Sequence, residues 1–479
     1  MSERFSFGWF TAFFVVCAVV CLRVALEFAL LSYPIDIQPD QHYLRAYLEN
    51  IYYFLNLALL LAWLLSAVTR LPLLRTARFV AVFYPVILLP PVIDALMGRR
   101  EGYFYATPSN FLWNLLTLSF VRGDASTGIS IEILLGLAGI GVYAWYHTRS
   151  VLKALGAFFL GDLIIVLLST PELFYPAKAY FIRRPFLPLY YFLPFLGLTA
   201  AAAWFRARPK LAAVLGNFRW VRVAAFACLV ALGGWTRHLT GHRVYALDLF
   251  FAGLAIALVW KVAVVLNDIH DRPIDALSHR GRPLVTGAVS EYEYRLVAFL
   301  CGFVALSLLA VVNWTVLAIG AAALAMAWAY SVPPLRLRRT LAGYAITGAS
   351  VAVAFLCGVS ASGPIPLLGK DAVRVFALYL FALGCIVPMA KDARDIEGDS
   401  KNGVRNLFTV YGPGKGLRIY LVLFSVVLLA SALIDLRLGL AALPLAAAAC
   451  AAFVKWRYFA IMYAAALVQT AAAAYILFG

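Results

Sequence analysis

The sequence predicts an all-α, polytopic membrane protein. Of its 479 residues, 64% are hydrophobic and 13% are charged, whereas about a quarter of the residues in a typical soluble domain are charged. Apolar runs of about 20 residues, long enough to cross a bilayer as a helix, recur along the whole chain. The net charge of +17 is gathered in short connections between these runs. This pattern is typical of topology-setting charge and disfavours nucleic-acid binding.

The first 205 residues contain six candidate spans. They lie near 8–31, 51–69, 76–97, 128–146, 151–169 and 186–205. We expect residues 1–205 to form an N-terminal transmembrane domain, and no motif indicates its role. The first run is too long for the core of a signal peptide and lacks a clear small-residue cleavage site. The basic segment RARPKLAAVLGNFRWVR (206–222) contains no acidic residue, and we interpret residues 206–219 as a cytoplasmic linker.

Residues 220–479 form the second predicted domain, with nine candidate spans. They lie near 220–237, 246–267, 292–310, 313–330, 341–361, 372–391, 416–434, 437–454 and 458–478. With the linker in the cytoplasm, most Arg and Lys side chains fall on the cytoplasmic side, as the positive-inside rule requires. We therefore expect a multi-pass integral membrane protein, in the inner membrane if the cell is bacterial. The seven cysteines lie in apolar segments without paired spacing, which indicates core packing and not disulfides or metal ligands.

Two similar acidic motifs follow the second and the sixth span of this domain, both on the predicted cytoplasmic side. Residues three or four apart share one face of a helix, so the carboxylates of each motif can point into one site. Such a cluster needs a counter-charge, and magnesium binds carboxylates together with substrate phosphates. We therefore predict a site for Mg²⁺ and a phosphate-bearing substrate. The predicted metal-binding and catalytic residues are Asp268, Asp271, Asp275, Asp392, Asp395 and Asp399.

Basic side chains accompany both motifs. The connection AYSVPPLRLRRT (329–340) brings Arg336 and Arg338 to the same side, Arg282 follows the first motif, and Lys391 opens the second. Arg and Lys are good phosphate ligands, so we expect these four side chains to contact a diphosphate. Lys261 lies about two turns before the first motif, and a lysine inside a span needs a carboxylate or the diphosphate as its partner.

The predicted site fits an isoprenyl diphosphate, which has a diphosphate head and an apolar tail. Magnesium and arginine would stabilise the charge that builds on the leaving diphosphate. The carbocation left behind needs dry, apolar walls, and aromatic rings can stabilise it further. The aromatic side chains available for this are Trp235, Trp260, Trp314, Trp328 and Tyr330.

Three segments resemble the UbiA superfamily of intramembrane prenyltransferases. They are NDIHDRPIDALSHRGRPLVTGAVS (267–290), KDARDIEGDSKNGVRNLFTVYG (391–412) and YSVPPLRLRR (330–339). In motif form they are most similar to chlorophyll synthases, homogentisate prenyltransferases and digeranylgeranylglyceryl-phosphate synthases. The resemblance implies nine helices, aspartates that hold magnesium diphosphate, and a lipophilic or aromatic acceptor. It also implies that Asn267 forms a hydrogen bond in the diphosphate-binding site. Asn406 stands where this pattern usually has Thr, and Leu407-Phe408 replace Leu-Pro; we expect neither change to touch the acids.

Other functions stay open at this point. An intramembrane terpene cyclase or a phosphoribosyl transferase of the same superfamily would use similar motifs. A transporter is the alternative from another class, because fifteen spans with intramembrane charges such as Arg23, Asp94 and Asp162 suit transport. Transporter sites commonly lie at the midplane, whereas both acidic motifs lie at one face. No motif identifies a protein partner.

Overall fold

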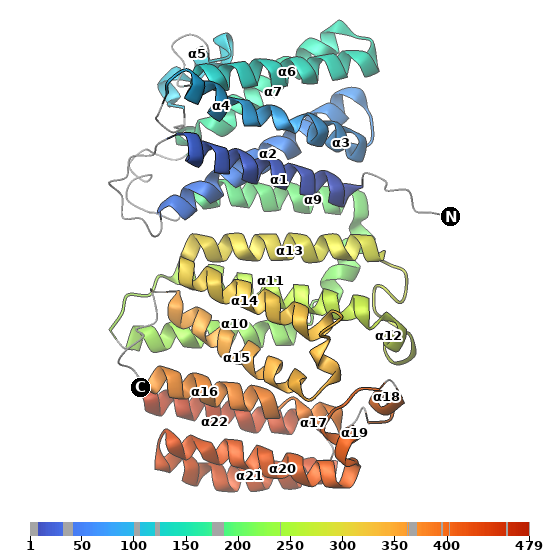
Figure 1. The fold of residues 1–479 in the computed structure, drawn as a ribbon, viewed down its shortest axis with the longest axis vertical. Coiled ribbons are helices and arrows are strands. Elements are labelled where there is room, and N and C mark those ends of the chain that lie inside the picture. The colour runs from blue at the N-terminus through green and yellow to red at the C-terminus, as the bar shows by residue number, and fades with distance from the viewer. Residues whose placement is uncertain are drawn as a thin grey trace. The chain divides into compact units, whose positions relative to one another are not determined.

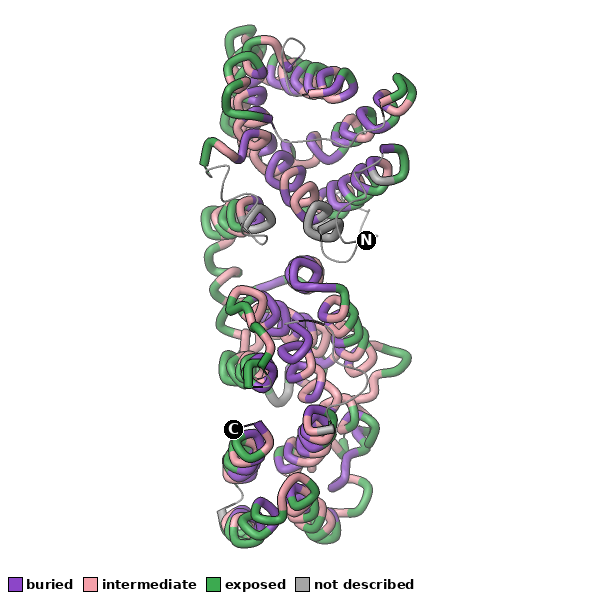
Figure 2. The backbone as a smooth tube through the Cα atoms, turned by 90° about the vertical axis from the view of Figure 1, so that its left-hand side faces the viewer, coloured by how far each residue is buried: buried purple, intermediate pink, exposed green. Residues whose placement is uncertain are grey.

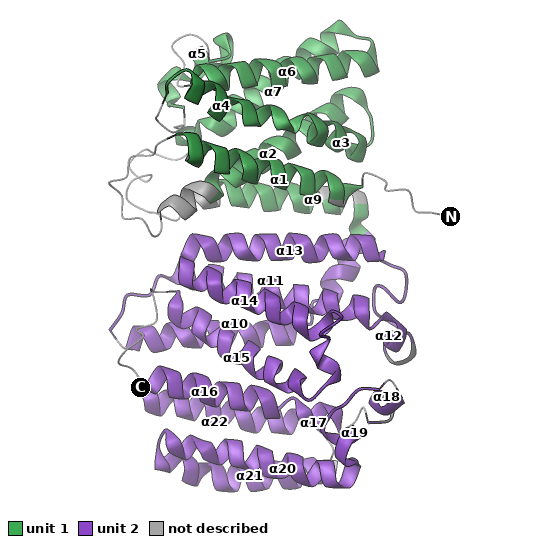
Figure 3. Ribbon diagram, viewed as in Figure 1, with its two compact units in different colours: residues 1–208 green, residues 209–479 purple. Residues whose placement is uncertain are grey.

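The computed structural model is helical throughout the residues that it describes and contains no strand among them. These residues are 8–31, 42–99, 106–119, 125–174, 186–239, 241–361, 363, 371–393, 396–401, 403–456 and 458–478. The chain divides into two compact units, residues 1–208 and 209–479 (Figure 3). The all-α membrane class predicted from the sequence is confirmed.

Unit 1 contains the helices that correspond to the first six predicted spans, although the last residues of α9, from 209 on, belong to unit 2. They are α1 (Trp9–Leu30), α2 (His42–Thr69), α3 (Leu73–Phe83), η1 (Tyr84–Leu88), α4 (Leu89–Leu96), η2 (Pro108–Asn110), α5 (Phe111–Thr117), α6 (Thr127–Thr148), α7 (Val151–Ser169), η3 (Pro171–Leu173) and α9 (Phe186–Gly216). The third span is divided into α3, η1 and α4, and prolines stand in the first turns of η1 and α4. Proline removes a backbone donor and interrupts a regular helix, which explains the division.

The intramembrane charges of unit 1 have different environments. Asp94 accepts hydrogen bonds from Ser126 Oγ and, at 2.9 Å, from the backbone N–H of Gly128, so it caps the start of α6. Arg23 and Glu27 form a buried ion pair of 2.8 Å within α1. Asp162 is fully buried in α7, and neither of its carboxyl oxygens has a hydrogen-bond partner among the described residues. Asp94 and Arg23 therefore stabilise the fold through their polar contacts. For Asp162, no hydrogen bond within the described residues offsets the free-energy cost of burying its carboxyl group.

Unit 2 contains nine long helices among its described residues, as the sequence predicts. They are α10 (Trp220–Leu239), α11 (Ala246–His270), α13 (Glu291–Val312), α14 (Trp314–Ser331), α15 (Ala342–Ser360), α16 (Asp371–Ile386), α20 (Pro413–Leu429), α21 (Leu436–Trp456) and α22 (Ala460–Phe478). The shorter elements are α12 (Arg272–Ser278), η4 (Leu337–Arg339), α17 (Met389–Asp392), α18 (Ile396–Lys401), α19 (Leu407–Tyr411) and η5 (Ala430–Leu433). Of these, α12, α17, α18 and α19 lie at the same end of the long helices, on the right-hand side of unit 2 in Figure 1.

Twelve helices in the described residues are long and apolar enough to cross a membrane, or thirteen if the bent pair Ala207–Gly216 and Trp220–Leu239 is one span. The helices over the predicted spans near 8–31, 186–205 and 220–237 are not among the twelve, and the last of them enters only as part of the bent pair. Within each unit the buried positions lie mainly on the inward sides of the helices (Figure 2). Outward positions include large apolar side chains, such as Leu96 and Leu433, each 84% exposed. An apolar exterior of this kind suits lipid contact and not water.

Close backbone contact joins α10 to α15 in unit 2. A Cβ atom added at Gly358 would lie 1.9 Å from the carbonyl oxygen of Val230, and one added at Gly233 would lie 2.2 Å from that of Phe355. Small residues commonly permit this approach between membrane helices, where packing replaces hydrophobic burial as the driving force. These two glycines fix α15, which carries Tyr344 at the end of unit 2 where the acidic motifs lie.

Candidate active site

The first acidic motif lies where α11 ends. Asn267 and Asp268 are in the last turn of α11, Asp271 separates it from α12, and Asp275 is in α12. Pro273 stands in the first turn of α12, so the proline interrupts the helix here as the sequence predicts. The three aspartates are between 1% and 3% exposed. Carboxylates this deeply buried require partners.

Asp268 accepts four hydrogen bonds. Its Oδ1 accepts from Arg282 Nη1 at 2.7 Å and from Arg219 Nη2 at 3.1 Å. Its Oδ2 accepts from Asn217 Nδ2 at 2.6 Å and from the Tyr294 hydroxyl at 3.3 Å. Asp268 therefore joins residues that come from three separate parts of the sequence.

Arg282 also donates to Asp275 and so bridges two carboxylates of the motif. Burial raises the pKa of Asp275 to about 6, although the guanidinium of Arg282 opposes this shift. The nearby charge of Asp268 acts in the same direction as burial. The ionisation of Asp275 thus depends on Arg282.

Asp271 faces the basic connection between α14 and α15. Arg336 Nη2 donates to Asp271 Oδ1 at 2.9 Å, and Arg338 forms an ion pair with Asp271. Arg338 Nη1 also donates to Asn267 Oδ1 at 2.6 Å. Arg336 adopts a left-handed backbone conformation with φ of +38°, which is unfavourable for a residue with a side chain and is commonly found at functional sites.

Arginines balance the charge of the first motif. Its three carboxylates contact four guanidinium groups, those of Arg219, Arg282, Arg336 and Arg338. The repulsion that led us to expect a divalent ion is therefore already relieved by these side chains. An anionic group that enters this cluster would meet a local excess of positive charge.

The second motif lies in and between α17 and α18. Asp392 accepts a hydrogen bond from the Tyr344 hydroxyl, and Asp399 accepts one from Asn406 Nδ2 at 2.6 Å. The side chain of Asn406 also caps α19. Our expectation that the change at 406 leaves the acids untouched was wrong, because a short amide side chain can cap a helix and donate to a carboxylate at once. Asp395 lies outside the described residues, and Lys391 is an exposed residue of α17.

The basic connection joins the two motifs. The backbone N–H of Arg405 donates to the carbonyl oxygen of Arg339 at 2.9 Å, which links η4 to the segment after the second motif. Burial lowers the pKa of Arg338 to about 10, and the negative charge of Asp399 opposes that shift. Arg338 therefore pairs with the first motif and also feels the charge of the second. The motifs lie at the same end of unit 2 (Figure 1).

Lys261 is fully buried and points to backbone carbonyls. Its Nζ donates to the carbonyl oxygens of Val214 at 2.9 Å and Asn217 at 3.3 Å. It also lies 5.4 Å from the ring centroid of Phe218. Val214 and Asn217 lie at the C-terminal end of α9, where backbone carbonyls have no partner within the helix. The ammonium group of Lys261, which belongs to α11, supplies that partner. Diphosphate contact by Lys261 stays a prediction.

Several residues of the site were not predicted from the sequence. Asn217 and Arg219 lie in the segment interpreted as a linker. The sequence alone indicates that its basic residues set the membrane topology, and not that they are part of a binding site. Tyr294 and Tyr344 lie in the first turns of α13 and α15. A tyrosine at the end of a membrane span usually anchors the helix at the membrane–water interface. Their contacts with Asp268 and Asp392 depend on helix packing that sequence periodicity does not specify.

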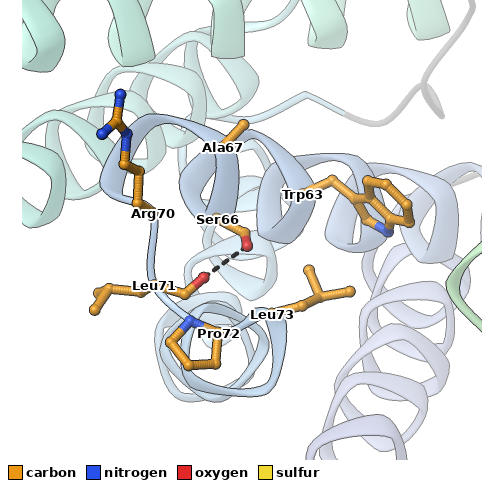
Figure 4. A pocket seen from close by; sticks show the side chains of 7 residues that line it. All are labelled: Trp63, Ser66, Ala67, Arg70, Leu71, Pro72 and Leu73. Atoms are coloured by element: carbon orange, nitrogen blue, oxygen red, sulfur yellow. Dashed lines mark hydrogen bonds between the residues drawn. The ribbon is translucent and has the colours of Figure 1, made fainter. Parts of the chain in front are cut away.

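The described residues contain no group of three or more His, Cys, Asp or Glu side chains placed around one metal position. The donor chemistry nevertheless suits magnesium, because both motifs offer carboxylate oxygens next to cationic side chains that attract phosphate. A separate hollow in unit 1, near the turn between α2 and α3, is lined by seven residues (Figure 4): Trp63, Ser66, Ala67, Arg70, Leu71, Pro72 and Leu73. It contains no residue of either motif.

The arrangement of two acidic motifs and one basic connection can be compared with known proteins. The family described as the UbiA prenyltransferase family matches residues 224–477, just over half of the chain. A digeranylgeranylglyceryl phosphate synthase of Methanopyrus kandleri is 32% identical over 169 residues, which cover 35% of this chain and 59% of that protein. The bacteriochlorophyll synthase 33 kDa chain of Rhodobacter capsulatus is 34% identical over 184 residues, which cover 35% of this chain and 56% of that protein. The chain thus spans less than two thirds of these relatives.

Among solved structures, that of a UbiA homolog from Archaeoglobus fulgidus bound to DMAPP and Mg²⁺ is 18% identical and has a TM-score of 0.42, with 55% of this chain and 98% of that chain covered. The structure of a digeranylgeranylglyceryl phosphate synthase has a TM-score of 0.44 at 20% identity, with 56% and 97% covered. The family match contains both acidic motifs and the basic connection. By this match, the chain belongs to the UbiA prenyltransferase family.

Proposed function

We propose that the protein transfers an isoprenyl group from an isoprenyl diphosphate to a lipophilic or aromatic acceptor within the membrane, with magnesium as cofactor. The observation that supports this proposal is that one basic connection contacts the first acidic motif and also the segment that follows the second. These contacts lie at one end of an apolar helical bundle. Such a site can hold a diphosphate at its polar end and an apolar chain among its helices.

The cationic side chains would bind and activate the diphosphate. Arg282, Arg336, Arg338 and Lys391 would contact its oxygens, and their charges would stabilise the negative charge that grows as the allylic carbon–oxygen bond breaks. The three arginines already contact carboxylates of the first motif. Each guanidinium has several donors in a fixed plane, so it can keep a carboxylate and gain a phosphate oxygen.

The aspartates would hold the magnesium. The described candidates are Asp271, Asp275, Asp392 and Asp399, and Asp395 stays a prediction. Bound magnesium would neutralise charge on the leaving diphosphate. Asn267 would orient Arg338, to which it is already hydrogen-bonded.

Apolar and aromatic side chains would shelter the carbocation from water. Trp260 packs against Phe226, with ring centroids 5.1 Å apart. Tyr330 lies within electrostatic reach of Asp392, Arg219 and Arg222. Of the five aromatic residues named from the sequence, we propose Trp260 and Tyr330 as the groups that stabilise the cation, which needs a ring face and a dry wall.

The location and domain organisation are part of the proposal. Positive-inside topology would place the motifs on the cytoplasmic side, in the inner membrane of a bacterial cell. The acceptor would reach the site from the bilayer. Residues 1–205 would form a separate transmembrane domain, and residues 206–219 would join it to the prenyltransferase domain.

The test is release of inorganic diphosphate by the full-length protein, purified in detergent and supplied with Mg²⁺ and geranyl diphosphate together with a lipid extract as acceptor source. We expect Asp271→Ala and Asp395→Ala to abolish release while the protein still folds. Asp435→Asn is the matched control, because Asp435 lies between α20 and α21, away from the motifs. Unchanged release in both alanine variants would exclude the mechanism. Product analysis without an acceptor distinguishes transfer from cyclisation.

A further inference from the structure

Asp268 differs from the neighbouring aspartates in how its oxygens are used. Two donors meet each of its oxygens, and a carboxylate offers about four lone-pair positions in total. By contrast, Asp271 is held by two arginines, and Asp275 accepts from Arg282. A metal ion could therefore bind Asp268 only by displacing one of its four partners.

Two of those four partners come from the segment that follows α9. Asn217 and Arg219 lie between α9 and α10. Asn217 Nδ2 reaches Asp268 and also lies 2.8 Å from the Tyr294 hydroxyl, so a single amide ties together α11, α13 and this segment. The other two partners, Arg282 and Tyr294, hold Asp268 from the far side of the first motif and from α13.

Lys261 secures the same segment from inside the bundle. It lies on α11 two turns before Asp268, and its ammonium binds the carbonyl oxygens of Val214 and Asn217. The backbone of Asn217 is thus held by Lys261 while its side chain is held by Asp268. Residues 214–219 are therefore held on one face of α11 by two side chains, those of Lys261 and Asp268.

We propose that Asp268 is a positioning residue and not a metal ligand. Together with Lys261 it anchors residues 214–219 on α11, and it fixes the Arg282 guanidinium that also holds Asp275. This inference rests on the proposed function, since it assigns different tasks to two aspartates of one motif. Asp275 would coordinate the metal, whereas Asp268 would hold in place the side chains that surround it.

The test compares Asp268→Asn with Asp275→Asn in the full-length protein. The probe is Mn²⁺ with inorganic pyrophosphate, and binding is measured by electron paramagnetic resonance. We expect Asp275→Asn to weaken Mn²⁺ binding by more than about 100-fold, because it removes a ligand, whereas loss of a group that only supports a ligand costs about 10- to 100-fold. Asp268→Asn should weaken Mn²⁺ binding by only about 10-fold, the lower limit for loss of a supporting group. It should also lower the melting temperature, and lower kcat for diphosphate release more than it changes KM.

Asn217→Ala provides an independent variant in case Asp268→Asn does not fold. It keeps the carboxylate and removes one donor, so we expect kcat to fall about tenfold with Mn²⁺ affinity unchanged, the size expected for one hydrogen bond to a charged group. Equal loss of Mn²⁺ affinity in Asp268→Asn and Asp275→Asn would overturn the proposal, as would an Asn217→Ala variant that matches wild type in every measurement. Absence of Mn²⁺-pyrophosphate binding by the wild type would instead refute the proposed function itself.

Discussion

Replacement of Arg282 by Gln removes the charge that bridges Asp268 and Asp275. Both carboxylates are buried, and only 16% of the Arg282 side chain is exposed, so water screens these contacts little. Hydrogen bonds to charged groups contribute about 1.5–3 kcal/mol each, and Arg282 makes two. Gln can retain one weaker bond, and Arg219 continues to hold Asp268, so we expect a net loss of about 3 kcal/mol. In a domain of this size that corresponds to a melting temperature about 6–12 °C lower.

The same substitution should change the pH dependence of activity. The pKa of Asp275 is about 6, and Arg282 holds it below the value that burial alone would give. Without Arg282 the pKa rises, so the acidic limb of diphosphate release, which requires the Asp275 carboxylate, should move to higher pH. A folded-state pKa above the ordinary value of 3.8 also means that the protonated carboxyl stabilises the fold. That contribution is fully present below about pH 4 and is lost as pH rises through about 6.

The assays are thermal unfolding in detergent at a fixed heating rate and diphosphate release between pH 5 and pH 9. Arg280→Gln is the matched control, because Arg280 is an exposed arginine two positions away with the same charge. It should leave both the melting temperature and the acidic limb unchanged. The reasoning fails if Arg282→Gln behaves like Arg280→Gln in both measurements.

Three further substitutions test other contacts. Tyr344→Phe removes the hydroxyl that donates to Asp392 and should lower kcat for diphosphate release about tenfold; an unchanged kcat would show that this contact is dispensable. Gly358→Ala places a Cβ atom 1.9 Å from a backbone oxygen of α10, so it should lower the melting temperature by several degrees, whereas Gly253→Ala, with no atom within 4 Å, should not. Asp162→Leu removes a buried carboxyl without a hydrogen bond in the described residues and should raise the melting temperature; a lower value would indicate an essential role for that carboxyl.

Much of the fold follows from the sequence because hydrophobic length is a strong signal in membrane proteins. The nine helices of unit 2 and the helix break at Pro273 both appear where the apolar runs and the proline predict them. Division of the third span in unit 1 is also a consequence of prolines that can be read from the sequence. Its exact form, a short 3₁₀ segment between two α-helices, depends on local packing.

The candidate site was predicted less completely than the fold. The repeated aspartate spacing and the nearby arginines can be read from the sequence, but the choice of partner for each carboxylate cannot. Arg282 lies seven residues from Asp275, a separation at which a loop allows many arrangements. Asn217 lies 51 positions from Asp268, and only the contacts of residues 214–219 with α11 bring them together. Lys261 was expected to face charge, whereas its observed partners are backbone carbonyls, which carry no sequence signal.

A structure of the full-length protein with Mg²⁺ and geranyl thiodiphosphate, a substrate analogue that ionises slowly, would examine the shared site most directly. We predict one diphosphate whose magnesium is coordinated by carboxylates from α12 and from the α17–α18 region together, with Arg338 between them. A diphosphate bound by one of these regions alone, or elsewhere in the protein, would contradict this account.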